Sequence, residues 1–124
     1  MTKVDAVKYI LKNMNDADKT LLFKESLDLK TLRQFVVGLE WEYLDIVKST
    51  LGERFFSMLL DDIELNKGLV TEMGFSVAVS VILAEFESLQ EAGAIQFSFP
   101  ENEETTAEAN LARVESWIKA VRAK

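Results

Sequence analysis

The sequence predicts an all-α protein, a compact antiparallel pile of short helices with one long central helix and a short extended tail. The first observation is that 124 residues contain one proline and five glycines, too few for the turns of a many-stranded fold. The second is that apolar residues recur at steps of three and four along most of the chain, as in amphipathic helices. The third is the composition, 48% hydrophobic and 28% charged, which is typical of a globular domain.

Start and stop signals divide the N-terminal part into short helices. Thr2 is expected to cap a first helix, with Asp5 completing a capping box. The pair Asn15-Asp16 should end that helix, and Asp16 should cap a second short one. Asp28 is expected to open a third helix.

Two glycines separate the next elements. Gly38 and Glu40 mark a turn from the third helix into a fourth, and Gly52 separates the fourth from a fifth. Each helix has one apolar stripe and needs its neighbours to bury it. The expected apolar residues are Leu32, Phe35, Val36 and Leu39 in the third helix and Trp41, Leu44, Ile46 and Val47 in the fourth.

The segment Phe75–Leu83 fits two patterns. Its alternating Phe and Val residues resemble a strand, but apolar residues also recur at helical spacing and continue as far as Leu89. The combined length, residues 71–92, favours one long buried helix, with Gly93 as its stop signal.

The C-terminal part is expected to differ from this body. Residues 94–100 should form a short extended tail laid on the helices of a domain spanning residues 1–100. Residues 101–124 should be an acidic linker followed by an amphipathic helix that begins at Thr105-Thr106. Trp117 is expected to anchor that helix on the domain.

The composition also excludes several classes of function. The net charge of −7, from 14 basic and 21 acidic residues, opposes binding to nucleic acid and to anionic lipid. Without histidine or cysteine, the chain lacks the usual general base, nucleophile and metal ligands. The longest apolar stretch, residues 73–89, is interrupted by polar residues and should not span a bilayer. We therefore expect a cytoplasmic protein that is not an enzyme and has no metal or cofactor.

The fifth helix, within GERFFSMLLDDIELNKG (residues 52–68), carries opposed faces. At about 100° per residue, Asp61 lies about 20° from Arg54 and Asp62 about 80° from it. Met58 and Leu65 fall on the same charged side. The expected core side consists of Phe56, Leu59, Leu60 and Ile63. A solvated surface would explain the charges alone, whereas a ridge that mixes acid, base and apolar groups suits a contact surface.

The order of these elements resembles the C-terminal domain of the flagellar motor switch protein FliG. The likeness covers roughly residues 20 to 97, and its pieces are moderately specific through their order and spacing. The matching residues are Gly38, Glu53-Arg54, Asp61-Asp62, Gly68 and the run from Glu91 to Ile95. The resemblance implies an armadillo-like helical fold and a charged ridge that faces the cytoplasmic loop of the stator protein MotA.

By matching position, the resemblance makes Arg54, Asp61 and Asp62 ridge members. Two basic positions of the family differ, since Val37 replaces a usual lysine and Thr71 a usual arginine. Nearby Arg33 and Lys67 are candidates to replace those charges. The N-terminal and middle domains of the family are absent from this sequence, and the terminal helix is an addition.

The predicted site is therefore a partner-binding ridge made of Arg33, Arg54, Met58, Asp61 and Asp62, which would receive a basic or mixed-charge protein segment. The partner implied by the resemblance is the flagellar stator or another switch component, which would place the protein at the flagellar basal body. The alternative is a non-motor cytoplasmic adaptor that has lost stator contact. The sequence leaves self-association open.

A cation site is a weaker alternative. A similar helical superstructure occurs in the regulatory domain of MgtE magnesium transporters, where acidic residues hold metal. Asp61, Asp62 and Glu64 on one exposed helix would make at best a weak, water-rich cation site.

Overall fold

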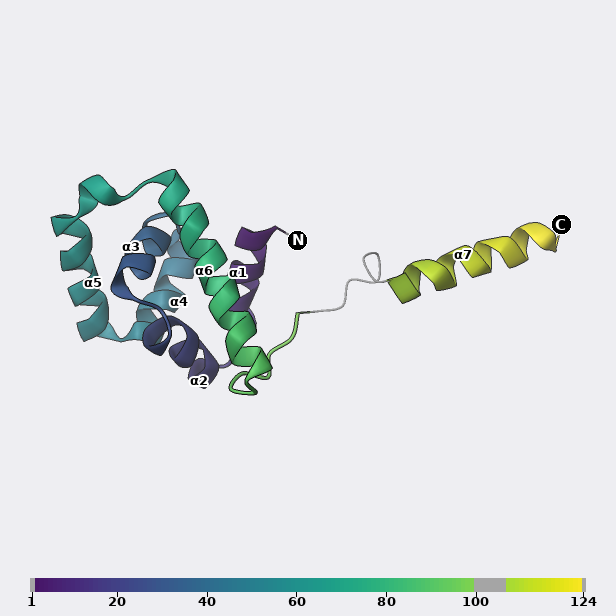
Figure 1. Cartoon of the computed structure of the whole chain (residues 1–124), viewed down its shortest axis with the longest axis horizontal. Coiled ribbons are helices and arrows are strands. Elements are labelled where there is room, and N and C mark those ends of the chain that lie inside the picture. The colour runs from purple at the N-terminus through teal and green to yellow at the C-terminus, as the bar shows by residue number, and fades with distance from the viewer. Residues whose placement is uncertain (1, 100–106, 124) are drawn as a thin grey trace.

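The computed structural model describes residues 2–99 and 107–123 and is helical throughout its regular elements (Figure 1). The described residues contain no strand, so the expected all-α class is confirmed. A π-helical segment (η1) follows α2, and a 3₁₀ turn (η2) precedes α6. The elements are α1 (Lys3–Asn13), α2 (Asp16–Lys19), η1 (Thr20–Glu25), α3 (Leu29–Val37), α4 (Trp41–Leu51), α5 (Glu53–Leu65), η2 (Lys67–Leu69), α6 (Glu72–Glu91) and α7 (Ala107–Arg122).

The helices from α1 to α6 enclose one hydrophobic core. The long helix α6 packs against α1, α3 and η1, and α4 packs against α1, η1 and α5. Helix α5 contacts α3 and α4 and lies at one side of the pile (Figure 1). The largest fully buried side chains come from α1, η1, α3, α4, α5 and α6 and from the segment after α6. They are Ile10, Leu11, Leu22, Phe23, Leu32, Phe35, Leu51, Leu59, Ile82 and Ile95.

The N-cap residues of the helices are the expected ones, except at α2. The hydroxyl of Thr2 accepts a hydrogen bond from the Asp5 amide, and the Asp5 carboxylate accepts one from the Thr2 amide, which completes the capping box. The Asp28 carboxylate accepts from the Thr31 amide at 2.7 Å. The prediction that Asp16 caps α2 was wrong. Asn15 is the cap, because its side-chain oxygen accepts the Asp18 amide and Asp16 is already helical.

The ambiguous segment from Phe75 to Leu83 lies within α6. Thr71 caps this helix by accepting from the Gly74 amide at 2.9 Å, and Ile82 and Phe86 face the core. Gly93 has a φ of 77°, the left-handed conformation expected of the residue that stops a helix. Within the described residues, no helix combines the length and the hydropathy needed to cross a membrane.

Two residues expected in apolar stripes are exposed instead. Trp41 is 78% exposed because it is the first residue of α4, at the edge of the pile. Leu60 is 50% exposed. Helix α5 packs on neighbours along one side only, so its buried residues are limited to Phe56 and Leu59. The expected core side of α5 is therefore narrower than the sequence predicts.

The segment after α6 lies on the helices, as expected. Ile95 is buried, and the rings of Phe97 and Phe99 pack edge-on against Phe86, with centroids 6.1 and 5.6 Å from it. Tyr9 of α1 flanks both rings. The described part of this tail is extended rather than helical, and Pro100 lies outside the described residues.

Helix α7 stands apart from the pile in the structure (Figure 1). Its Trp117 is 66% exposed. The acidic linker and the expected helix start at Thr105-Thr106 lie outside the described residues. The structure does not show the expected packing of the terminal helix on the domain, so that packing stays a prediction.

Candidate interaction surface

Gly52 sets the direction of α5. It is the only residue between α4 and α5, and its φ of 87° lies in the left-handed region that favours glycine. A side chain built at this position would meet no atom within 4 Å, so the constraint is conformational rather than steric. The turn starts α5 beside the end of α4 and leaves the opposite side of α5 in solvent.

The solvent side of α5 carries an outer stripe formed by Arg54, Met58, Asp61 and Leu65. These four residues lie within about 60° of one another around the helix axis, and all are exposed, Met58 by 48% and Leu65 by 84%. Among the side chains that the structure describes, none forms an ion pair or hydrogen bond with Arg54 or Asp61. The outer stripe therefore combines two charges and two apolar groups that no described part of the chain covers.

Asp62 has a different environment from its neighbour. Its carboxylate accepts two hydrogen bonds from Arg33 of α3, at 2.7 Å from Nε and 3.3 Å from Nη2. Asn66 Nδ2 donates to the same carboxylate at 3.2 Å. The side chains of Arg33 and Asp62 are only 12% and 16% exposed. The hydrogen bond with Asp62 raises the pKa of the Arg33 guanidinium.

This ion pair divides the predicted ridge into two groups. Arg33 and Asp62 connect α3 with α5, whereas Arg54, Met58 and Asp61 remain exposed. Asp62, unlike Asp61, therefore contributes to the packing of α5 on α3, because its loss would leave the largely buried Arg33 without its partner. No local sequence pattern indicates this pairing, because the two residues belong to different helices.

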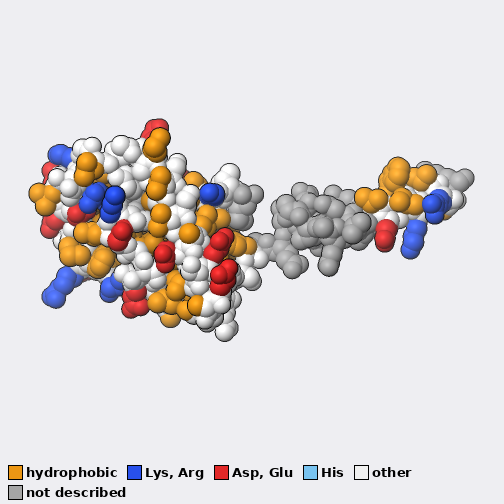
Figure 2. Space-filling view, viewed as in Figure 1, with side chains coloured by type: hydrophobic (Ala, Val, Ile, Leu, Met, Phe, Trp, Pro, Cys, Tyr) orange, Lys and Arg blue, Asp and Glu red, His pale blue; other side chains and the backbone are white. Residues whose placement is uncertain are grey.

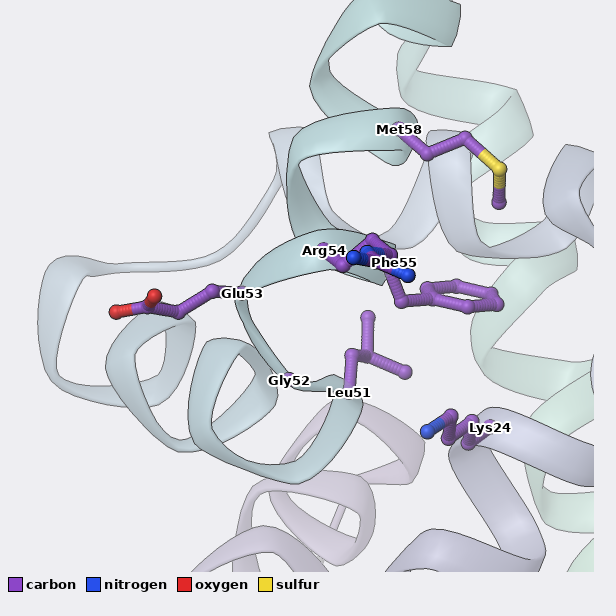
Figure 3. Close-up of a pocket in the computed structure, with 7 residues that line it drawn as sticks. All are labelled: Lys24, Leu51, Gly52, Glu53, Arg54, Phe55 and Met58. Atoms are coloured by element: carbon purple, nitrogen blue, oxygen red, sulfur yellow. The ribbon is translucent and has the colours of Figure 1, made fainter.

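A groove lies beside the N-terminal end of the outer stripe (Figure 3). It has a volume of ≈ 440 Å³ and is lined by Lys24, Leu51, Gly52, Glu53, Arg54, Phe55 and Met58. Leu51 is buried at its base, Phe55 is half-buried, and Glu53 points away from the other side chains (Figure 3). Sequence reasoning missed Lys24 and Phe55. Lys24 reaches the groove from η1, and Phe55 has the apolar character of a core residue.

The other end of α5 is acidic and partly paired. Glu64 and Lys67 form an exposed ion pair at 3.1 Å, so Lys67 is not an isolated substitute for a missing basic residue. Thr71 serves as the cap of α6, and Val37 is 51% exposed at the end of α3. In the described part of the chain, no three acidic side chains form a cluster suited to a metal ion.

No protein-family model, curated protein or solved structure matches this chain. The geometry of α5 and its neighbours is therefore the basis for assigning a contact surface to this chain.

Proposed function

We propose that this chain is a non-enzymatic protein-interaction module that contacts its partner through the outer stripe of α5 and the adjoining groove. The observation that carries the proposal is the contrast on one helix. Asp62 is held by Arg33, while Arg54, Met58 and Asp61 are exposed and make no polar contact with described side chains. Stability alone explains the exposed charges poorly, since exposed ion pairs contribute only about 0–1 kcal/mol.

The mixture of side chains supports contact rather than solvation. Methionine is an adaptable apolar residue that suits contact surfaces, and arginine is enriched at protein interfaces. Met58 and Phe55 provide apolar area beside Arg54, and the groove between them can receive a side chain from a partner. A helix face that only needed solvation would not require these apolar groups.

The charges indicate the chemistry of the partner segment. Lys24 and Arg54 give the N-terminal end of α5 a basic edge, whereas Asp61 places an acidic group further along the helix. A mixed-charge segment fits this arrangement, with an acidic group beside Arg54 and a basic group beside Asp61.

The resemblance to the FliG C-terminal domain favours a particular partner. It suggests the cytoplasmic loop of the flagellar stator, with this chain located at the basal body. Arg54 and Asp61 occupy the matching ridge positions and are exposed. The alternative, a non-motor adaptor, retains the same contact surface with a different partner. It is favoured by the replacement of two usual basic positions by Val37 and Thr71.

A binding measurement with charge-reversed variants tests the proposal. The full chain is titrated with the purified stator loop of its own host, as parent, Arg54→Glu and Asp61→Lys. Both substitutions should weaken binding, most at low salt where charge steering is least screened. Glu87→Lys, a charge reversal at another exposed residue, on α6, is the matched control and should bind as the parent does.

In a swimming host, the same two variants should reduce motility at normal protein levels. If the parent chain does not bind the stator loop, the proposed role in the flagellar motor is contradicted. Equal binding by the parent and both variants would contradict the outer stripe as the contact surface.

A further inference from the structure

Helix α6 exposes an apolar stripe that nothing covers in the described structure. Met73, Val77 and Val81 recur every fourth residue and are 77%, 56% and 37% exposed. We name these three residues the α6 stripe. Hydrophobic side chains gather over α6 on the face shown in Figure 2. A hollow of ≈ 450 Å³ runs beside the stripe, where α6 adjoins the start of α3.

Helix α7 carries a second apolar face. Val114, Trp117 and Val121 lie within about 60° of one another around the helix axis. They are 52%, 66% and 51% exposed. An amphipathic helix is stabilised mainly by burying such a face, and no described part of the chain covers this face of α7.

We propose that α7 docks on the α6 stripe of its own chain, with the two helices antiparallel. The lengths of the two faces agree. At 1.5 Å per residue, Met73 to Val81 spans about 12 Å and Val114 to Val121 about 10.5 Å. The apolar side chains can therefore contact one another along the whole of both stripes.

The connection between the helices is long enough. Phe99 is anchored with its ring 5.6 Å from that of Phe86, which is about 7.5 Å along α6 from Val81 at the helical rise. Residues 100–106 can span at most about 25 Å. Helix α7 can thus begin beside the C-terminal half of α6 and run toward its N-terminus.

Charge favours the antiparallel direction. It brings the basic last turn of α7, with Lys119 and Arg122, close to Glu72 in the first turn of α6. The hollow beside the stripe is lined by one acidic and one basic residue, Asp28 and Lys30, so it adds no preference of its own. The dipoles of the two helices also oppose one another in this direction, which is the favourable arrangement.

The tether favours the chain's own helix over that of a second copy. A connection no longer than residues 100–106 holds the two helices at an effective concentration in the millimolar range, while the net charge of −7 makes two copies repel one another. Docking would cover the α6 stripe and leave the outer stripe of α5 exposed, because the two stripes belong to different helices of the pile.

Cysteine pairs test the docking directly, because the sequence contains no cysteine. Val77→Cys combined with Ile118→Cys should oxidise rapidly to a disulfide within one chain, seen as faster migration on a non-reducing gel. Leu65→Cys with Ile118→Cys is the matched control, since Leu65 is 84% exposed on α5, and should cross-link far less. Equal cross-linking of the two pairs would overturn the proposal. Cross-linked dimers as the main product would overturn docking within one chain.

Fluorescence supplies an independent readout in the full chain. In a Trp41→Phe background, the emission of Trp117 should be blue-shifted and resist quenching by acrylamide. Val77→Asp should abolish both effects, whereas Leu65→Asp should not. Docking would be contradicted if Trp117 emitted as an exposed tryptophan does and if Val77→Asp left this emission unchanged. Blue-shifted emission lost on dilution, together with a dimer by light scattering, would show that a second copy is the occupant instead.

Discussion

Asp61 and Asp62 are adjacent in the sequence but have different physical roles in the structure. The carboxylate of Asp62 receives three side-chain hydrogen bonds, two of them from Arg33, and its side chain is 16% exposed. Asp61 is exposed and makes no such contact with described side chains. An interaction with a partner can therefore be altered at Asp61 without disturbing the helix packing.

The first prediction compares alanine substitutions at these two positions. Asp62→Ala should lower the free energy of unfolding by about 1–3 kcal/mol, because it leaves the largely buried Arg33 guanidinium without its acceptor. Asp61→Ala should change it by less than about 0.5 kcal/mol, as surface substitutions generally do. Urea denaturation followed by circular dichroism measures both. Similar destabilisation by both substitutions would contradict the division of the ridge.

At the scale of the elements, the helix ends show why some boundaries were predictable. Caps depend on residues three positions apart, so Thr2 and Asp28 could be identified as N-caps from the sequence alone. Gly93 could be identified in the same way, because few other residues adopt its positive φ. The Asp16 error arose where two adjacent residues could both serve as the cap.

Contacts between distant elements could not be read in this way. The Arg33–Asp62 ion pair and the entry of Lys24 into the groove depend on how the helices cross, which no local pattern encodes. The exposure of Leu60 has the same origin. Helical periodicity gives the direction of a side chain, but only the neighbouring helices determine whether it is covered.

The second prediction concerns the Asp28 cap of α3 and pH. Hydrogen bonds from Thr31 lower the pKa of the Asp28 carboxyl. The stabilisation from this group should be complete above the ordinary aspartate value of about 3.9 and should disappear as the pH falls through the lowered pKa. Asp28→Ala should therefore cost about 0.5–2 kcal/mol at pH 7 and less in acid.

Asp28→Asn is the matched control for this cap. Asparagine caps helices about as well as aspartate but does not ionise, so it should retain most of the stability at pH 7. Unfolding free energies of the three proteins at several pH values provide the measurement. A cost of Asp28→Ala that stayed constant below pH 4 would contradict a charged cap.

At the scale of the whole molecule, α6 connects the layers of the pile. It contacts α1, α3 and η1, and its buried side meets the aromatic tail at Phe86. Gly38 of α3 lies so close to Phe75 of α6 that a methyl group there would collide with the ring. The pile is therefore closely packed around α6, while the outer stripe of α5 remains on its periphery.

The third prediction tests the central position of α6. Ile82→Ala should cost about 2–5 kcal/mol, because the side chain is 0% exposed and its removal leaves a cavity. Ala84→Ser, on the exposed side of the same helix, should change stability by less than about 0.5 kcal/mol and serves as the control. Thermal melting compares the two. If the Ile82→Ala variant melted at the same temperature as the parent, α6 would not be the central helix of the pile.

The proposed contact between the outer stripe of α5 and a protein partner can be tested inside the cell. The most direct measurement places a photo-crosslinking amino acid at Met58 of the full chain in its own host and identifies the captured proteins by mass spectrometry. We predict one specific cross-linked partner, lost when Asp61→Lys or Arg54→Glu is added and not captured from the control position Glu87 on α6. Cross-links at Met58 that are absent, or that match those at Glu87 and persist after both charge reversals, would contradict the claim.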